Sequence, residues 1–294
     1  MISPTDLLAN KPLFDEYCAK SERRVSCYHF VSIFAWQEFF DFSFVVINDR
    51  LCVYAHQPGG DFLYLPPLGG PIDVPTLAES FRRMVPGPLA RVENICDNQL
   101  PGLEFAGYNA HHKADEYVYR KSDIATLRGN AYKSQRHDVN LALKHVPFFE
   151  VYDPRYRSAC GSLYERWAED RRRRRDDSVY LAMLDDNRRV HALVIAHAGQ
   201  LGLVGRMAMV DGELAGYTFG YPLNEDTFCV LFEVTDPTVP GLSSFCFQSL
   251  CRDPELSGFN LINTMDDFGM PTVGRAKEAL HPVFKISLFT LTSK

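Results

Sequence analysis

The chain has 294 residues, which is enough for one large domain or two of ordinary size. Its 46% hydrophobic and 23% charged residues are typical of a globular protein with a sizeable core. The net charge of −6 excludes an overall positive field for nucleic acid, so any contact with RNA would need a local basic patch.

Targeting and metal signals are missing from the sequence. The first residues show no basic segment followed by an apolar one, and the apolar runs are shorter than the ~18–20 residues that span a bilayer. The eight cysteines include no C-x-x-C pair, and nothing beside Cys246 and Cys251 completes a zinc site. We therefore expect reduced thiols, no metal and a cytoplasmic protein, with a peripheral position at the inner membrane surface as an alternative.

The first half of the chain predicts helices and short strands. A helical stretch over residues 5–20 is followed by residues 26–40, whose aromatic spacing indicates a buried amphipathic helix. Three β runs lie within residues 43–70, separated by the turn signals Asn48-Asp49 and Pro58-Gly59-Gly60. A helix over 75–85, a strand over 116–120 and a helical stretch over 123–145, interrupted by Gly129, complete this half.

The second half predicts a clearer order of elements. Helices over 155–174 and 190–196 precede an antiparallel meander of three strands between residues 201 and 236. A helix over 241–251, a strand over 259–263, a helix over 271–280 and a strand over 283–290 follow.

This order is typical of an N-acyltransferase domain of the GNAT type, and the first half fits it less closely. We therefore predict an α/β (α+β) protein of tandem GNAT-like acyltransferase domains, with mixed, mostly antiparallel sheets flanked by helices. The expected domains are residues 1–148 and 149–294.

Four stretches resemble a known family. They are FVSIFAWQEFF with LYLPPLGG, LRGNAYKSQRHDVN in the middle, and the late segment NTMDDFG…AK…HP. Together they resemble an uncharacterised bacterial family related to the C-terminal catalytic domain of phosphatidylglycerol lysyltransferases. The resemblance covers most of the chain and implies two GNAT folds with kinship to the Fem-type aminoacyltransferases.

The resemblance also implies site residues. The family's basic helix is similar to Leu127, Gly129, Lys133, Arg136 and Asn140, and its late motif is similar to Asn263, Asp267, Gly269, Lys277 and Pro282. Two positions depart from the pattern, since Met265 stands where relatives carry an acid and Gly274, with Arg275 beside it, stands where arginine is expected.

Glu233 is the first catalytic candidate, because it is the only charge inside the apolar strand of residues 227–235. An ionised carboxylate in a sheet is costly unless it is paired or faces a cavity. GNAT enzymes often carry the general base on the corresponding strand. The alternative is an acid at the exposed end of the strand, because Asp236-Pro237 follows.

Asp267 and Lys277 are the other catalytic candidates, with Asn263, Asp266 and Arg275 as substrate-binding residues. A carboxylate here could hold the ammonium group of an aminoacyl donor or deprotonate an amine. The structural alternatives are a helix cap by either acid and a favourable position for Lys277 near the helix end. We expect Asp266 to cap the helix, and Asp267 and Lys277 to face one polar pocket. The inner face of this helix should contain Val273, Ala276 and Leu280.

Arg128, Lys133, Arg136 and Asn140 form a basic helical stretch that could bind the phosphates of a tRNA acceptor end or a lipid head group. The alternative is a solvated helix face. Residues 236–248 contain a single glycine, Gly241, where enzymes that use acyl-CoA carry a glycine-rich phosphate cradle. Acetyl-CoA is therefore disfavoured, and no cofactor is expected.

Two functions remain open. The first is an aminoacyltransferase that uses charged tRNA and an amine or hydroxyl acceptor, either a lipid or a small molecule. Such an enzyme needs no nucleophile, because an aminoacyl ester is already activated and the protein mainly orients the reactants. The second is a non-catalytic tandem GNAT that binds a ligand or a protein, with an acyl-CoA-dependent N-acyltransferase as a further alternative. Met265, Gly274 and the net charge favour the non-catalytic reading.

Overall fold

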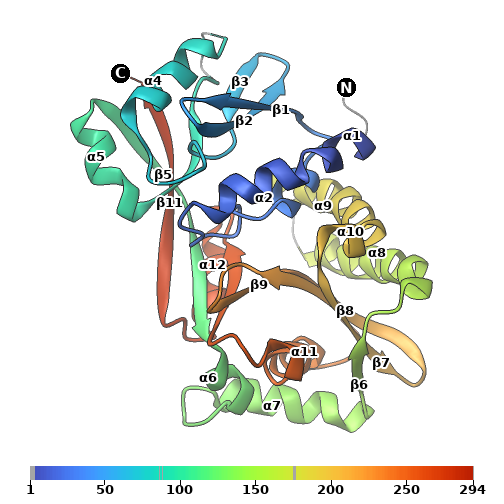
Figure 1. Cartoon of the computed structure of the whole chain (residues 1–294). Coiled ribbons are helices and arrows are strands. Elements are labelled where there is room, and N and C mark those ends of the chain that lie inside the picture. The colour runs from blue at the N-terminus through green and yellow to red at the C-terminus, as the bar shows by residue number, and fades with distance from the viewer. Residues whose placement is uncertain (1–3, 86, 88, 175–176, 294) are drawn as a thin grey trace. The chain divides into compact units, whose positions relative to one another are not determined.

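The computed structural model describes residues 4–85, 87, 89–174 and 177–293 (Figure 1). The chain forms two compact units. The first contains Met1–Tyr117, Asp266–Gly274 and Lys285–Lys294, and the second contains Val118–Met265 and Arg275–Phe284. The expected boundary between residues 148 and 149 lies within the second unit and stays a prediction.

The first unit contains five α-helices and four strands that belong to it alone, among the residues that are described. The helices are α1 (Pro4–Ala9), α2 (Lys11–Ala19), α3 (Val31–Phe34), α4 (Val74–Arg83) and α5 (Leu100–Phe105), with a 3-10 turn η1 (Asp97–Gln99). The strands are β1 (Asp41–Ile47), β2 (Arg50–Gln57), β3 (Gly60–Leu63) and β4 (Val92–Cys96).

Four elements divide between the units: β5 (Tyr108–Arg120), β10 (Leu261–Asp266), α12 (Pro271–Glu278) and β11 (Phe284–Ser293). The strand order of the first unit is β1-β2-β3-β4-β11-β5. All the pairs with a recorded register are antiparallel except β3 with β4. Helices α4 and α5 contribute Leu77 and Leu103 to a core with Tyr54, Ile95 and Leu291 of the strands.

The remaining elements belong to the second unit. Its helices are α6 (Lys121–Thr126), α7 (Lys133–Ala142), α8 (Arg157–Arg174), α9 (Ser178–Ala196), α10 (Ala198–Leu201) and α11 (Leu242–Cys251), with 3-10 turns η2 (Leu143–His145), η3 (Pro154–Tyr156) and η4 (Pro254–Leu256). Its strands are β6 (Phe148–Val151), β7 (Val204–Val210), β8 (Glu213–Pro222) and β9 (Thr227–Thr235), and most of β10 also lies in it.

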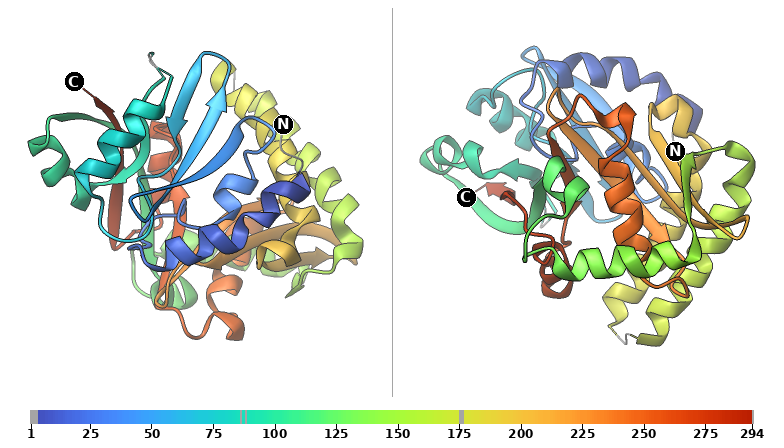
Figure 2. Two further views of the ribbon diagram at one scale, coloured as in Figure 1. Left: turned by 45° about the horizontal axis from the view of Figure 1, so that its top comes forward. Right: turned by 90° about the horizontal axis from the view of Figure 1, so that it is seen from below.

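The sheet of the second unit is covered on both faces. The strand order is β5-β10-β9-β8-β7-β6, and β6 through β9 are antiparallel neighbours while β9 and β10 are parallel. Tyr164 of α8 packs on one face with Tyr217 and Phe219, and Cys246 of α11 packs on the other with Ala208. Helix α7 lies beside α11 (Figures 1 and 2). This mixed, mostly antiparallel sheet with flanking helices confirms the predicted fold class.

The predicted helices over residues 26–40 and 190–196 differ most from the observed ones. The expected helix over residues 26–40 is wrong in length, since only Val31–Phe34 is helical and its residues are all buried. Aromatic and β-branched side chains lose rotamer freedom in a helix, so this run packs as successive turns instead. The expected helix over 190–196 is the end of α9, which starts much earlier because Asp177 accepts the backbone N–H groups of Val179 and Tyr180.

Candidate active site

The two central strands of the second unit pair over a short distance. The parallel register between β9 and β10 runs from Thr227 opposite Leu261 to Cys229 opposite Asn263, and both strands continue beyond it. Ligands of sheets with parallel neighbours commonly bind beyond the carboxyl ends of the strands, where neighbouring strands diverge. This part of the sheet is therefore a candidate ligand-binding region.

A β-bulge changes the course of β9 near this place. The register between β8 and β9 shifts between Phe219 and Gly220, which leaves Leu231 as an extra residue on β9. A bulge bends its strand and leaves the extra residue outside the regular ladder. Glu233, the predicted base, follows the bulge by two residues on β9, as expected from the sequence.

The carboxyl group of Glu233 is half-buried. The Ser243 hydroxyl at the start of α11 donates a hydrogen bond to its Oε1 at 2.7 Å. Burial raises the pKa of Glu233 to about 7, although the hydrogen bond from Ser243 acts in the opposite direction. A carboxyl group with this pKa is about half ionised at neutral pH, which suits a group that accepts a proton and returns it.

Thr218 on β8 lies directly opposite Glu233 in the register. Its side chain is 1% exposed, and its hydroxyl oxygen finds no hydrogen-bond partner in the part of the chain that is described. Sequence reasoning missed both Thr218 and Ser243. The signals were the one threonine in an apolar strand and a serine two residues after Gly241, at the start of a helix.

The start of α11 packs closely against α7. Gly241 has a φ of +77°, and a Cβ on this residue would lie 1.9 Å from the backbone carbonyl oxygen of Asp138. A residue other than glycine would therefore both strain the backbone and displace α7. The N-terminus of α11 has a backbone carbonyl of α7 as its neighbour.

A second group of contacts lies at the end of β10. The buried Asn263 accepts the backbone N–H of Met265 at 2.7 Å, and Met265 has a φ of +63°. Lys277 of α12 donates from Nζ to the carbonyl oxygens of Thr264 at 2.5 Å and Met265 at 2.9 Å. Tyr119 in turn donates to the carbonyl oxygen of Lys277. The structure thus brings Asn263 and Lys277 to the same irregular turn.

The inner face of α12 differs from the expected one. Ala276 is exposed, so its predicted inward packing is wrong, whereas Val273 and Leu280 are half-buried. Gly274 is buried and Lys277 is half-buried. The helix is therefore arranged around the polar contacts of Lys277 and the small Gly274 rather than around an apolar stripe.

Asp267 lies in the first unit and is held by protein groups. Its Oδ2 accepts the Tyr117 hydroxyl at 2.9 Å, and its Oδ1 accepts the backbone N–H of Gly269 at 3.0 Å. A Cβ on Gly274 would lie 3.0 Å from Oδ2, so the missing side chain makes room for this carboxylate. Asp266 accepts the N–H of Phe268 at 3.1 Å, in the loop before α12. The expected single pocket around Asp267 and Lys277 stays a prediction.

The four residues of the predicted basic stretch have two different environments. Arg136 donates hydrogen bonds to the carbonyl oxygens of Leu127 and Gly129. These two hydrogen bonds hold the turn after α6. Arg128, Lys133 and Asn140 are exposed to solvent. On α7, Lys133 and Asn140 are two turns apart and lie on one face. Arg275 of α12 is also exposed.

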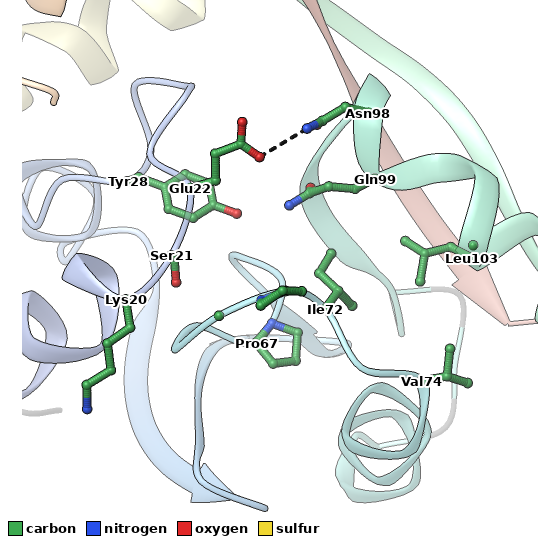
Figure 3. Close-up of a pocket in the computed structure, with 13 residues that line it drawn as sticks. Lys20, Ser21, Glu22, Tyr28, Pro67, Ile72, Val74, Asn98, Gln99 and Leu103 are labelled. Carbon is green, nitrogen blue, oxygen red and sulfur yellow. Dashed lines mark hydrogen bonds between the residues drawn. The ribbon is translucent and has the colours of Figure 1, made fainter. Parts of the chain in front are cut away.

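The first unit contains a cavity that the sequence analysis did not anticipate (Figure 3). Its volume is about 490 Å³, and its wall contains Ser21, Glu22, Tyr28, Gln99 and Leu103. Glu22 accepts a hydrogen bond from Asn98 at 3.1 Å. No predicted site residue lines this cavity, and its wall includes Gly70.

The residues that the structure describes contain no candidate metal centre and no candidate membrane-spanning helix. No group of three or more histidine, cysteine, aspartate or glutamate side chains there could hold a metal ion. No helix among the same residues is long and apolar enough to cross a membrane.

The chain matches a known protein family over most of its length. The family described as "Phosphatidylglycerol lysyltransferase, C-terminal" matches residues 19–289. No curated protein matches the chain.

Solved structures are similar over nearly the whole chain. A conserved protein of unknown function from Bacteroides thetaiotaomicron has a TM-score of 0.83 and 22% identity, over 98% of this chain and 97% of its own. The C-terminal domain of a putative lysylphosphatidylglycerol synthetase from Agrobacterium fabrum has a TM-score of 0.64 and 11% identity, over 98% and 92%. L-PGS from Bacillus licheniformis has a TM-score of 0.62 and 14% identity, over 86% and 84%. At these sequence identities, the structural similarity shows that the fold is shared.

Proposed function

The chain belongs to the family of phosphatidylglycerol lysyltransferase C-terminal domains, and we propose that it transfers an aminoacyl group from an aminoacyl-tRNA to an amine or hydroxyl acceptor. The family and the fold support an acyltransferase. The aminoacyl-tRNA donor, and a lipid head group or small molecule as the acceptor, are the finer parts of the proposal.

The observation that carries the proposal is the state of Glu233. It combines half-burial, a hydrogen bond from Ser243, a position just after a bulge and a pKa raised to about 7. A strongly perturbed carboxyl group beside an irregular part of a sheet is a candidate general base. In the proposed reaction Glu233 contacts the nucleophile of the acceptor.

The proposed reaction balances without a cofactor or a covalent enzyme intermediate. The acceptor nitrogen or oxygen attacks the carbonyl carbon of the aminoacyl ester while Glu233 takes the proton of that nucleophile. The tetrahedral intermediate collapses, the ester C–O bond breaks, and Glu233 returns the proton to the ribose oxygen that leaves. A backbone N–H at the bulge around Leu231 would stabilise the oxyanion.

The residues at the end of β10 and on α12 would position the donor. Asn263 and Lys277 hold the turn at Met265, and we assign them a positioning role at the edge of the site. Asp267, Asp266 and Arg275 remain proposed contacts for the ammonium and carbonyl groups of the amino acid.

The tRNA would contact the exposed side of the α6–α7 region. Arg128 and Lys133 are solvent-exposed cations there, and Asn140 adds a hydrogen-bond donor on the same face of α7 as Lys133. Such groups can bind phosphates. Arg136 would hold the turn that presents Arg128. The close approach of the Asp138 carbonyl to Gly241 also disfavours a pyrophosphate at the start of α11, which argues against acyl-CoA as the donor.

The test is a transfer assay with purified protein. A pool of labelled aminoacyl-tRNAs is offered with bacterial lipid vesicles, and separately with soluble amines, and products are identified by mass spectrometry. We expect an aminoacylated product, and we expect Glu233→Gln to lower its rate of formation by about 10²-fold or more. Glu225→Gln is the matched control, because Glu225 is an exposed acid in the β8–β9 turn.

The alternatives give different results in the same assay. Transfer that requires acyl-CoA in place of aminoacyl-tRNA would replace the donor in our proposal. An absence of transfer from every donor, with the protein folded, would favour the non-catalytic binding module. Equal rates for Glu233→Gln and Glu225→Gln would remove Glu233 from the mechanism.

A further inference from the structure

Exposed apolar side chains gather at one edge of the second unit. Among the described residues, four of the twelve exposed large hydrophobic side chains lie between residues 143 and 151. They are Leu143 (50% exposed), Val146 (67%), Phe148 (69%) and Val151 (66%). A concentration of this kind marks an interaction surface more often than a scatter of single residues does.

These side chains surround an edge strand. Strand β6 is the last in the strand order and pairs only with β7 among the described strands (Figure 1). The backbone N–H of Tyr152 donates to the carbonyl oxygen of Gly205, which lies towards β7. Because N–H groups alternate along a strand, the N–H of Val151 points to the open side. The open edge of β6 can therefore form backbone N–H···O=C hydrogen bonds with another strand.

The apolar side chains project from both faces of this edge. Phe149 packs against Phe245 of α11, so it points to the α11 face of the sheet. Val151 lies two residues further along and shares that face, whereas Phe148 points to the opposite face. A helix docked on one face of the sheet would cover either Phe148 or Val151 and leave the other side chain exposed to water. A strand that continues the sheet brings side chains to both faces at once.

The two ends of β6 carry charges of opposite sign, so two antiparallel copies of this strand are complementary in charge. Lys144 and His145 precede β6, and the exposed Glu150 lies near its end. In an antiparallel pair of two identical strands, the basic end of one copy lies beside the acidic end of the other. Isologous contacts of this kind generate closed two-fold dimers.

We propose that β6 pairs antiparallel with β6 of a second copy of this chain, so that the sheet continues across a two-fold axis. Phe148 then lies opposite its partner's equivalent on one face of the continued sheet, and Val151 lies on the other face, away from the two-fold axis. In this register Lys144 of each copy lies towards Glu150 of its partner, at a diagonal position. This proposal does not rest on the proposed reaction, since none of these residues belongs to the transfer site.

Sedimentation equilibrium of the full chain tests the proposal at concentrations from about 1 to 100 µM, the range in which moderate dimers dissociate. We expect a concentration-dependent dimer. Phe148→Lys should weaken it at least about tenfold, as expected for an apolar anchor at an interface centre. Val151→Pro should do the same, because it removes an outward N–H without touching the β7 ladder. Val179→Lys is the matched control, since Val179 is equally exposed on α9.

A charge exchange separates self-pairing from other modes of association. Lys144→Glu and Glu150→Lys should each weaken the dimer, and the double variant should restore it. A wild-type chain that is monomeric over the whole range overturns the proposal. So does a dimer whose dissociation constant is unchanged in Phe148→Lys. Thermal melting of each variant confirms that the comparison is made between folded proteins.

Discussion

Glu233 has opposite effects on stability and on the proposed catalysis. Burial keeps its carboxyl group protonated to a higher pH than in an unfolded chain, where a glutamate titrates near 4.5. Between these two pKa values the unfolded state ionises and the folded state does not. The contribution of Glu233 to stability therefore falls as the pH rises from about 4.5 to about 7.

Replacement of Glu233 should reveal how much stability the protein loses by burying this carboxyl group at neutral pH. Glu233→Gln keeps an oxygen that can accept the Ser243 hydroxyl but removes the titration. We expect the variant to be more stable than the wild type at pH 7.5, by about 1–3 kcal/mol, and close to it at pH 4.5. Urea unfolding at the two pH values measures this difference. A stability difference that does not grow with pH would contradict the raised pKa, and Glu225→Gln provides the baseline.

At the scale of elements, the contact between α7 and α11 depends on one glycine. Gly241 ends the connection from β9 in a left-handed conformation, and its missing side chain lets α7 approach. The same contact brings the Asp138 carbonyl to the start of α11. The packing of two helices thus also shapes the electrostatics beside Glu233.

Gly241→Ala should separate these helices. A left-handed alanine costs about 1–2 kcal/mol, and the clash with Asp138 adds to it, so we expect a loss of at least about 2 kcal/mol of unfolding free energy. Gly258→Ala is the control, because no atom lies within 4 Å of its Cβ position. It should change stability by less than about 0.5 kcal/mol. Equal melting temperatures for the two variants would show that α7 tolerates the displacement.

At the scale of the whole molecule, buried neutral histidines set the response to acid. His191 of α9 is 9% exposed, stacks on Phe232 at 4.0 Å between ring centroids, and lies 2.9 Å from the Tyr217 hydroxyl. Burial lowers the pKa of His191 to about 3, and burial also lowers the pKa of His29 in the first unit to about 3. Each unit therefore contains a group that resists protonation.

The buried histidines should make acid destabilising at pH values where carboxyl groups of ordinary pKa are still ionised. Below a pH of about 6.5 the unfolded chain binds protons that buried His191 does not, so stability falls as the pH drops from 6.5 towards 3. At pH 5 the loss from His191 should be about 2 kcal/mol. His191→Phe should remove this part of the pH dependence, measured as unfolding free energy between pH 7 and 5. His111→Phe, the same change at an exposed position, should leave the slope as in the wild type.

Local patterns were sufficient for most elements of the second unit. The apolar runs and turn signals predicted β7, β8 and β9, and Gly241 marked the start of α11. They also singled out Glu233, because one charge in an apolar strand stands out without any tertiary information. The patterns failed for residues 26–40, where packing rather than propensity decides the backbone.

The sequence by itself determined the order of strands and helices after residue 155, the fold class and the identity of Glu233 as an unusual acid, because these depend on periodicity and on residue type. Only the tertiary structure decided that Thr218 and Ser243 accompany Glu233, since register and the β8–β9 bulge set which side chains meet. It alone placed Asp266–Gly274 and Lys285–Lys294 with the first unit, and Lys277 on the carbonyl groups of the β10 turn. Such contacts join residues far apart in the chain, and no local pattern encodes which distant partner a polar group finds.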